Sequence, residues 1–430
     1  MQPLNFMKPT PSSLNSSDID LLVLGGGILG VGVAALAAAL GYSVMLIRLG
    51  DEDRPQAETL RNQGWLQSGM MYVNRFKGNR KAGLKLAKKM YAWGHTMLTR
   101  LGIPIPDENN RAILRVRTPQ EGVQILSDAR DLKISKFVRQ LAESESQAKL
   151  GSLFEEGSLY YSLPDIPFDE AAVLEVLRQN AVSDEALLLN TKTPARLIPD
   201  SGVAGRFNCE WEGGTLSPRV TVLAAGAGNY PLLEQLGVSP PMTLRQTPLL
   251  VVRDELSTTV PIYADRTRGF SFVRQSLHTA SGGAALVVGT NVHRDNVPFR
   301  AAVDRRISEK EVEDFKKCLP PVLEACVSTG RFTAGYELIP DSSVRKGYFE
   351  DWVTDVGGYP GLIMASPGRA TLGLMTAQQV VRRASKLLGA PSPSKGRDPS
   401  LVTTSSWDDE IHMHFEDYYS FDDSKKDEEL

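Results

Sequence analysis

The chain has 430 residues. At roughly 150 residues per domain, this length corresponds to about three domains or to one large α/β enzyme. Hydrophobic residues make up 42% and charged residues 23%, which is typical of a globular protein rather than a disordered, fibrous or membrane-embedded one. The 48 Lys and Arg residues nearly balance the 51 Asp and Glu residues, for a net charge of -3, and this disfavours extensive binding to a nucleic-acid backbone.

The cysteine and histidine content argues against a disulfide framework and favours a cytoplasmic, reducing setting. The 3 cysteines include no CxxC pair, and the 5 histidines show no spacing typical of a metal site, so no metal is expected. Residues 1–17 form a polar leader without the apolar region of a signal peptide. Residues 19–47 are apolar enough to resemble a membrane span, but the glycines inside them favour a strand, turn, helix and strand, so no integral membrane segment is expected.

A glycine-rich turn follows the first predicted strand, residues 19–24, which is short and apolar as a fully buried strand would be. The turn has the GxGxxG spacing, in which the first glycine allows a tight turn, the second lets a pyrophosphate approach and the third lets the helix pack closely. The predicted helix over residues 31–40 is rich in alanine, and the amides at its start would face a bound anion. The candidate cofactor-binding residues of this turn are Gly25, Gly27, Ile28, Leu29 and Gly30.

The second predicted strand, residues 42–48, departs from the dinucleotide-binding pattern at its last residue. This position normally carries Asp or Glu, which binds a ribose hydroxyl, but here it is Arg48. The acidic residues 51–53 follow directly and could take over that role. Arg48 could instead stack on adenine or bind a 2′-phosphate. It is therefore a candidate cofactor-binding residue, and an NADP-binding alternative stays open.

Two later segments favour FAD over a nicotinamide cofactor. Residues 219–228 form a predicted strand that ends in small residues and resembles a segment that returns near the cofactor in flavoproteins with two dinucleotide-binding domains. Residues 361–368 form another strand and turn, and a helix follows to about residue 388. Amides at the start of that helix could stabilise negative charge on a reduced flavin. The candidate cofactor-binding residues of the two segments are Ala225, Gly226, Gly368, Arg369, Ala370, Thr371 and Leu372.

The segment after the second predicted strand carries the most specific motif, RNQGWLQSGMMY at residues 61–72. With this motif the chain resembles the D-amino-acid oxidase superfamily of FAD-dependent oxidoreductases, and within it the members like L-2-hydroxyglutarate dehydrogenase and glycerol-3-phosphate dehydrogenase. Similar stretches at residues 244–247, 261–279 and 285–290 extend the resemblance, in the family's order, from residue 19 to about 388. The matching residues of the motif are Asn62, Gly64, Ser68, Gly69 and Tyr72, of which Asn62, Gly64 and Ser68 are candidate cofactor-binding residues by this resemblance.

The resemblance implies an α/β (α+β, two-lobed) flavoprotein with a Rossmann-like FAD-binding domain and an inserted substrate domain built on an antiparallel sheet. The sequence agrees, because residues 81–100 and 121–150 predict helices and the short alternating runs within residues 240–292 predict antiparallel strands. The implied FAD-binding domain comprises residues 18–95, 150–235 and 335–390, and the substrate domain residues 96–149 and 236–334.

Two positions depart from the family where the chemistry would take place. Gln67 stands where the nearest relatives have His, and glutamine can neither act as a base nor carry a covalent flavin, so non-covalent FAD is expected. Amino-acid oxidases of the family often grip the substrate carboxylate with an Arg, and Tyr336 or Glu337 stands at that place here. Either Arg245 or Arg274 holds the carboxylate instead, or the substrate is not a simple amino acid.

The candidate catalytic residues follow from the same resemblance. His278 could remove a hydroxyl proton while hydride passes to the flavin, or it is a hydrogen-bonded histidine at a sheet edge. Arg274 could clamp a substrate anion, or it is an exposed arginine of the sheet. Tyr72 and Tyr263 could line the substrate face of the flavin, or they belong to the core. The candidate catalytic set is His278, Arg274, Gln67 and Tyr263.

Residues 391–430 are predicted to form a linker and an acidic-aromatic tail. Between residues 407 and 430 the chain has ten acidic residues and two lysines, with five aromatic residues among them. Such a tail is either a solvated segment or one that docks onto a protein partner or onto the chain itself.

The sequence therefore predicts an FAD-dependent dehydrogenase or oxidase with a small-molecule substrate. It would remove hydride from a small 2-hydroxy acid, an amine or a similar CH–OH or CH–NH donor. One alternative is a flavin-binding protein with degraded or repurposed catalysis that acts through protein partners. A third hypothesis is an NAD(P)-dependent oxidoreductase.

Overall fold

The computed structural model of the protein describes most of the chain between residues 19 and 390. The predicted leader at residues 1–17 and the predicted tail at residues 391–430 lie outside the described residues. The described residues are 19–51, 54–55, 64–70, 73, 80–102, 111–167, 169–239, 242–276, 284–299, 306–328, 330–340, 352–366 and 372–390.

The described residues belong to two compact units. Unit 1 comprises the described residues of 1–58, 174–242 and 351–402. Unit 2 comprises those of 59–173, 243–350 and 403–430. Each unit is thus built from segments that are distant in the sequence.

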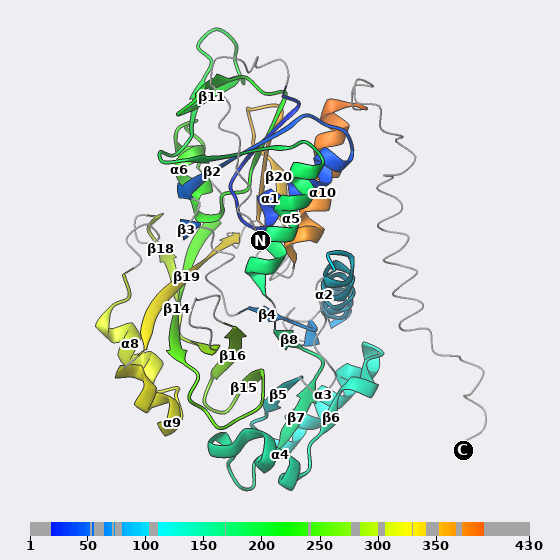
Figure 1. Ribbon diagram of the computed structural model, residues 1–430, viewed down its shortest axis with the longest axis vertical. Coiled ribbons are helices and arrows are strands. Elements are labelled where there is room, and N and C mark those ends of the chain that lie inside the picture. Colours follow the sequence, from blue (N-terminus) through cyan, green and yellow to red (C-terminus); the bar gives the residue numbers. More distant parts are fainter. Residues whose placement is uncertain are drawn as a thin grey trace, which may run out of the picture. The chain divides into compact units, whose positions relative to one another are not determined.

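A mostly parallel sheet forms the centre of unit 1 (Figure 1). The strands pair in the spatial order β20, β21, β13, β1, β2, and β2 also pairs with β9 and β3. Its parallel strands, taken in chain order, lie in the order 3-2-1-4-5, which is the order of a dinucleotide-binding fold. The strands are β1 (Leu21–Leu24), β2 (Val44–Asp51), β3 (Arg54–Pro55), β9 (Leu187–Thr191), β13 (Val220–Leu223), β20 (Trp352–Asp355) and β21 (Leu362–Ser366).

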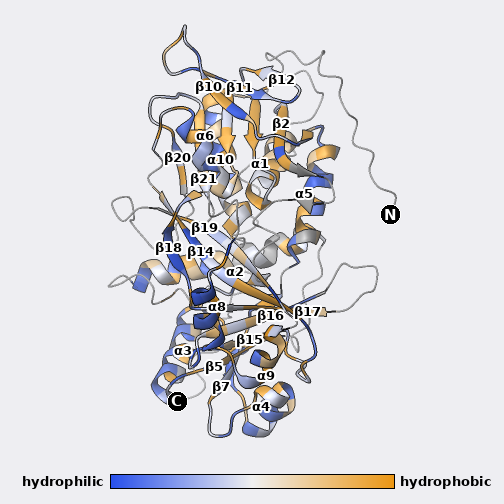
Figure 2. Cartoon of the chain, turned by 90° about the vertical axis from the view of Figure 1, so that its left-hand side faces the viewer, coloured by the Kyte–Doolittle hydropathy of each residue, from blue (hydrophilic) through white to orange (hydrophobic). Residues whose placement is uncertain are grey.

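The central parallel strands β1 and β13 are buried on both faces, which explains their nearly continuous apolar sequences. All four residues of β1, LLVL, are buried, as are all four of β13, VTVL. Figure 2 shows the resulting hydrophobic colouring of these strands. The predicted strand, turn, helix and strand of residues 19–47 is therefore confirmed: it is β1, a glycine turn, α1 (Ile28–Ala39) and β2.

Helices of unit 1 pack against this sheet and against one another. α1 and α10 (Gly373–Leu388) approach closely, because a Cβ on Gly32 would lie 2.6 Å from Leu374 Cδ2. α6 (Asn229–Glu234) follows β13, and most of α5 (Glu170–Ser183) also lies in unit 1. A small antiparallel sheet comprises β10 (Arg196–Pro199), β11 (Phe207–Trp211) and β12 (Gly214–Leu216), and η7 (Gly226–Gly228) is a short 3-10 helix.

A long, largely antiparallel sheet forms the centre of unit 2. The spatial order is β18, β14, β17, β16, β15, β5, β7, β6, with β19 also paired to β14, and β15 with β5 is a parallel pair. A separate pair joins β4 to β8. The strands are β4 (Trp65–Leu66), β5 (Ala112–Arg115), β6 (Arg139–Gln140), β7 (Tyr160–Leu163), β8 (Ile166–Pro167), β14 (Met242–Arg253), β15 (Ile262–Asp265), β16 (Phe270–Ser276), β17 (Ala284–Thr290), β18 (Arg294–Val297) and β19 (Arg331–Pro340).

Helices in unit 2 surround two hydrophobic clusters, one on Ile262 and Leu114 and one on Phe272 and Phe315. α8 is strongly hydrophilic except on its buried side, where Phe315 enters the core (Figure 2). The helices are α2 (Arg80–Arg100), α3 (Pro119–Asp131), α4 (Glu143–Leu150), α8 (Glu309–Lys316) and α9 (Pro321–Glu324), with the 3-10 helices η5 (Ser135–Phe137), η6 (Gly151–Leu153) and η8 (Ala325–Ser328).

The structure differs from the sequence-based expectations at one helix. The predicted helix over residues 121–150 is two helices, α3 and α4, because Lys133 with φ 59° ends the first and β6 follows. The assignment of residues 59–95, 150–173 and 335–350 to the FAD-binding domain stays a prediction, and their described residues belong to unit 2. The reason is strand pairing: β7 pairs with β5, and β4 pairs with β8.

Within the residues that the structure describes, no helix combines the length and the apolar character that a membrane span needs.

Candidate active site

The carboxyl ends of β1 and β13 lie side by side in unit 1, at the point where the order of the parallel strands reverses. Ligands of doubly wound sheets bind at such a point, because the loops after the two strands diverge there. The two turns that follow are held together, since the Ala224 amide donates a hydrogen bond of 2.8 Å to the carbonyl of Leu24. The structure thus brings together the predicted glycine turn and the predicted turn at Ala225 and Gly226.

The glycine turn after β1 has no space for side chains. Gly25 has φ 125°, and a Cβ there would overlap the carbonyl of Ala224. A Cβ on Gly30 would overlap the carbonyl oxygen of Gly25. α1 starts directly after the turn and has no acidic residue in its first turn, so the positive end of its dipole is available to an anion.

Arg48 closes the side of this turn. A Cβ on Gly26 would lie 2.7 Å from Cβ and Cδ of Arg48, so the aliphatic part of the arginine packs on the glycine backbone. Arg48 Nε donates to Oδ1 of Asn190, its register partner on β9, and Thr191 Oγ1 donates to the Arg48 carbonyl over 3.1 Å. A buried cation, 9% exposed, therefore lies where the pattern has a carboxylate.

The turn after β13 is fixed by Asn229, which is fully buried. The Ala225 amide donates to Asn229 Oδ1 over 2.9 Å, and Asn229 Nδ2 donates to the carbonyl of Leu223 over 3.4 Å. Next to it, Gly226 has φ 58° and open space where a Cβ would point. The turn is thus rigid on its protein side and open beside Gly226.

The first residues of α1 and α10 are in contact. A Cβ on Gly373 would lie 2.6 Å from Cγ2 of Ile28, so the two helix N-termini lie side by side. Leu372, the N-cap of α10, is fully buried. Two helix dipoles therefore direct their positive ends to one region of unit 1.

A second cluster lies in unit 2, around residues 64–70. The carboxylate of Asp165, between β7 and β8, accepts a hydrogen bond of 2.9 Å from Trp65 Nε1 and one of 2.8 Å from the Ser68 amide. Asp165 is 0% exposed, and burial raises the pKa of its carboxyl group, while the hydrogen bonds from Ser68 and Trp65 lower it in part. Gln67 lies between the two donors, so the carboxylate holds both sides of this candidate residue.

Strand β16 is attached to the same segment. Gln275 Nε2 donates to the carbonyl of Gly64 over 3.3 Å, so the end of β16 and the start of the motif are adjacent. Gly69 has φ 82°, and a Cβ there would lie 2.7 Å from the carbonyl oxygen of Ala87 on α2. The segment that carries Gln67 and Ser68 is therefore fixed between β8, β16 and α2.

The comparison with protein families decides the class of this chain. The family model described as FAD dependent oxidoreductase (DAO) matches residues 20–382. The chain belongs to this family. FAD is accordingly its cofactor and the chain is an FAD-dependent oxidoreductase, which sets aside the NAD(P)-dependent hypothesis.

Solved structures show the same fold at low sequence identity. Glycine oxidase from Geobacillus kaustophilus is 17% identical, with a TM-score of 0.62 over 90% of this chain and 98% of that one. L-amino acid deaminase from Proteus vulgaris is 15% identical, with a TM-score of 0.62 over 93% and 99%. Iminodiacetate oxidase from Chelativorans sp. BNC1 is 17% identical, with a TM-score of 0.60 over 87% and 96%. No curated protein matches the chain.

The unit 1 turn of this FAD-dependent oxidoreductase fits the dinucleotide that the family requires. Side chains at Gly25 or Gly30 would fill the turn, and Gly226 borders open space, so the backbone can approach a pyrophosphate there. Gly25, Gly27, Gly30 and Gly226 would hold that group with the amides of Ile28 and Leu29. The Ala225 amide itself donates to Asn229, so it supports the turn rather than a ligand.

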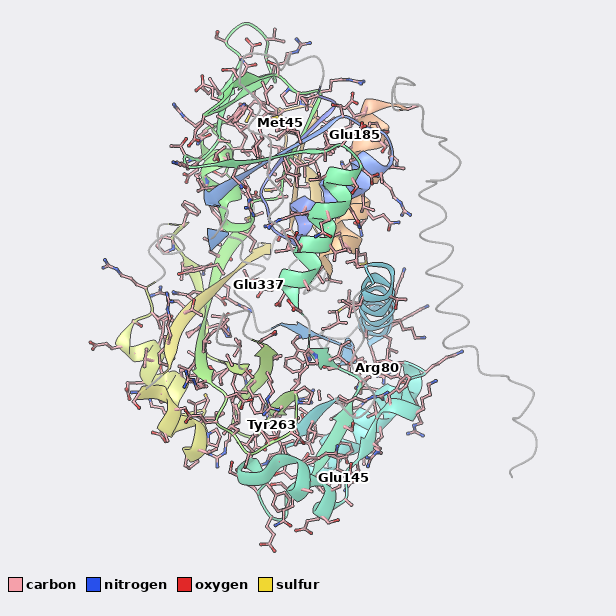
Figure 3. The ribbon with its side chains drawn as sticks, in the orientation of Figure 1. Met45, Arg80, Glu145, Glu185, Tyr263 and Glu337 are labelled. Carbon is pink, nitrogen blue, oxygen red and sulfur yellow. The ribbon has the colours of Figure 1, made fainter. Side chains whose placement is uncertain are left out.

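Two predicted catalytic residues of the oxidoreductase, Arg274 and Tyr263, lie in described parts of unit 2. Arg274 forms an ion pair with Asp254 and donates to the carbonyls of Val260 (3.1 Å) and Thr258 (2.7 Å), so its guanidinium is used to fix the loop before β15. Tyr263 is 1% exposed among the side chains of unit 2, which Figure 3 shows, and it contacts the aromatic rings of its core. The proposed roles of Arg274 as an anion clamp and of Tyr263 as a flavin-lining residue stay predictions.

Arg245 and Tyr336 also have partners within unit 2. Arg245 donates to both oxygens of Asp295, at 2.6 and 3.2 Å. The Tyr336 hydroxyl accepts a hydrogen bond of 2.9 Å from Gln246, which is fully buried. Arg245 is therefore paired with a carboxylate of the protein, and Tyr336 belongs to a polar network of β14 and β19.

Several predicted site residues lie outside the described residues, and their roles stay predictions. They are Asn62, Tyr72, His278, Gly368, Arg369, Ala370 and Thr371. Leu372 and Gly64 are described, and their proposed contacts with the cofactor stay predictions as well.

Sequence reasoning missed three polar residues that fix the candidate site: Asn190, Asn229 and Asp165. Each is close to a predicted residue in space, but Asn190 is 142 positions from Arg48 and Asp165 is 97 positions from Ser68. Asn229 had a local signal, since it follows the small residues of the turn at its i+4 position. The other two had none in a single sequence.

Proposed function

We propose that the protein oxidises the C–H bond next to nitrogen in a small amine or amino acid. FAD supplies the two-electron acceptor for this reaction. The solved structures with the same fold include a glycine oxidase, an L-amino acid deaminase and an iminodiacetate oxidase, all named for nitrogen-containing substrates. The sequence alone favoured hydroxy-acid dehydrogenases equally, so the choice between CH–NH and CH–OH donors depends on the residues of the site.

Gln67 is the residue that favours an amine over an alcohol as the hydride donor. Removing hydride from an alcohol requires a base that takes the hydroxyl proton, whereas a neutral amine supplies its own lone pair to the developing C=N bond. Gln67 stands where the hydroxy-acid relatives have a histidine, and no residue of 64–70 titrates near neutral pH. The turn that Asp165 holds therefore offers no base to an alcohol donor, and this favours an amine donor. The candidate base His278 lies outside the described residues, and the proposal assigns it no part in the choice of donor.

The ion pairs of two arginines favour a donor whose carboxylate is not bound by these arginines. Arg245 and Arg274 were the candidates to hold a carboxylate, and each is paired with an aspartate of the protein. A substrate carboxylate would have to displace Asp295 or Asp254 to use them. We therefore favour amines, and amino acids whose carboxylate is bound by other residues, with FAD bound non-covalently because Gln67 cannot form a flavin bond.

The test is anaerobic reduction of the purified, FAD-loaded protein. We expect amines or amino acids to bleach the flavin absorbance, and we expect the rate to rise with pH as the substrate ammonium group loses its proton. Bleaching by 2-hydroxy acids alone would overturn the choice of donor. The same titration with both substrate classes at equal concentration provides the internal control.

One alternative has a specific observation in its favour. A flavin-binding protein that acts through partners needs neither a catalytic base nor an arginine that binds a substrate carboxylate. Gln67, Arg48 and the paired arginines would therefore not impair its function. It predicts stoichiometric FAD that no donor bleaches. In that case the tail at residues 391–430, which lies outside the described residues, is the first candidate for docking, and deletion of residues 405–430 should abolish recovery of the partner.

We also propose a cytoplasmic location, from the cysteine content alone. All three cysteines are free. Cell fractionation of the native protein tests this, and recovery in an oxidising compartment contradicts it.

A further inference from the structure

A buried carboxylate lies beneath the turn that carries Gln67. Asp165 follows β7 and has no exposed surface. An ionised carboxylate is costly to bury, and burial raises the pKa of this one. Its burial is compensated by hydrogen bonds, so the donors of those bonds show what the carboxylate holds in place.

The donors to Asp165 come from both sides of Gln67. Trp65 Nε1 donates to Oδ2 over 2.9 Å, and the Ser68 amide donates to Oδ1 over 2.8 Å. Because the two oxygens hold residues 65 and 68 separately, they fix the path of the two residues between them, including Gln67.

Asp165 is itself a fixed point of unit 2. Its carbonyl accepts a hydrogen bond of 3.1 Å from the amide of Ala112 at the start of β5. The next residues form β8, in which Ile166 pairs with Leu66. The residue therefore links the position of β5 to the turn that carries Gln67.

We propose that Asp165 is a positioning residue, which sets the orientation of Gln67 and of the Ser68 backbone for the reaction. This inference rests on the proposed function, in which Gln67 and Ser68 belong to the flavin and substrate site. Asp165 does not touch substrate in this account. It acts through the Ser68 amide and the Trp65 indole, and its loss changes the site while the sheet of unit 2 remains.

The experiment compares Asp165→Asn with Asp265→Asn in the full-length, FAD-loaded protein. Asparagine keeps the volume at position 165, but its amino group cannot accept one of the two hydrogen bonds. We expect a shift of the flavin absorbance bands, an FAD dissociation constant at least about tenfold higher and slower anaerobic reduction.

Asp265 is the matched control, because it is also a buried aspartate of unit 2. It is 2% exposed, it is paired with Arg115 over 3.0 Å, and it accepts from the amides of Thr267 and Arg268, none of which belongs to residues 64–70. Asp265→Asn should lower the thermal midpoint and leave the flavin spectrum and the FAD dissociation constant unchanged. Equal spectral effects of both variants, or no effect of Asp165→Asn, would overturn the proposal.

A milder variant covers the case in which Asp165→Asn does not fold. Trp65→Phe removes the indole N–H and keeps an aromatic ring, so we expect a smaller spectral shift in the same direction, and an unchanged spectrum contradicts the positioning role. The spectrum and the FAD dissociation constant need no substrate. Failure of every amine to bleach the wild-type flavin would therefore overturn the proposed function and leave these two measurements to judge Asp165.

Discussion

Arg48 is the residue at which the nucleotide-binding turn departs most from its pattern. Its stem packs on Gly26 and its Nε donates to Asn190, so a buried positive charge is held beside the turn. A hydrogen bond that involves a charged group contributes about 1.5–3 kcal/mol to stability, so loss of Arg48 should loosen the strand end beside the turn. We expect Arg48→Ala to raise the FAD dissociation constant about tenfold or more, measured by fluorescence titration of the apoprotein.

Arg383→Ala is the control for this prediction, because Arg383 lies in the same unit but forms an exposed ion pair with Asp355. The FAD dissociation constant of the Arg383→Ala protein should equal that of the wild type. If Arg48→Ala binds FAD as tightly as the wild type, the arginine has no part in holding the dinucleotide and serves only to cover Gly26.

Cys209 allows a prediction that depends on pH. It is fully buried in β11, and burial raises the pKa of its thiol to about 12. Since the thiolate is the reactive form, only roughly one part in ten thousand of Cys209 is reactive at pH 8. In the native protein we expect Cys209 to react with a thiol reagent far more slowly than the half-buried Cys318 and Cys326.

The same shift has a defined sign for stability. A thiol whose pKa is raised on folding contributes stability that is fully present below the unfolded value of about 9 and is lost as the pH rises toward 12. Cys209→Ala should therefore lessen the alkaline loss of stability in that window, seen by denaturant titration at pH 8 and pH 10.5. Equal labelling of all three cysteines at pH 8 contradicts the burial argument.

At the scale of elements, the β1 turn and α1 were predictable because their signals are local. The glycine spacing, the apolar strand and the alanine-rich helix fall within residues 19–47. The network under Gln67 was not predictable, because β8 and Asp165 lie about a hundred positions from the residues that they hold. Likewise, the ion pairs that occupy Arg245 and Arg274 depend on loops brought together by strand pairing.

The turn itself can be tested with Gly30→Ala. The added Cβ overlaps the carbonyl oxygen of Gly25, so the turn and the start of α1 must separate. We expect loss of FAD from the purified protein and a lower midpoint of thermal unfolding. Gly357→Ala, in the same unit, has open space around its Cβ and should retain FAD. Retention of FAD by both variants would falsify the assignment of the turn to the dinucleotide.

At the scale of the whole molecule, strand pairing decides which segments form a compact unit, and the domain boundaries expected from the sequence stay a prediction. Residues 150–173 were assigned to the cofactor domain, and they belong to unit 2 because β7 pairs with β5 and β6. Pairing between strands that are distant in the chain leaves no signal in a single sequence. The resemblance implied two domains from the order of motifs, and that order is independent of where the boundaries fall.

The two units make distinct predictions for hydrogen exchange when FAD is added. Binding stabilises the unit that holds the ligand by RT ln(1 + [L]/Kd), which is about 2.7 kcal/mol at a hundredfold excess over Kd and slows exchange by opening of that unit about 100-fold. We expect the strongest protection in β1 and β13 of unit 1, next to the turns at Gly25 and Ala225. If the segment of residues 64–70 also contacts the flavin, its amides in unit 2 gain protection as well, whereas α8 does not.

NADP should produce neither effect, and the Gly30→Ala protein should show no FAD-dependent protection. Uniform protection of both units, or protection of α8 equal to that of β1, contradicts this assignment of the binding residues.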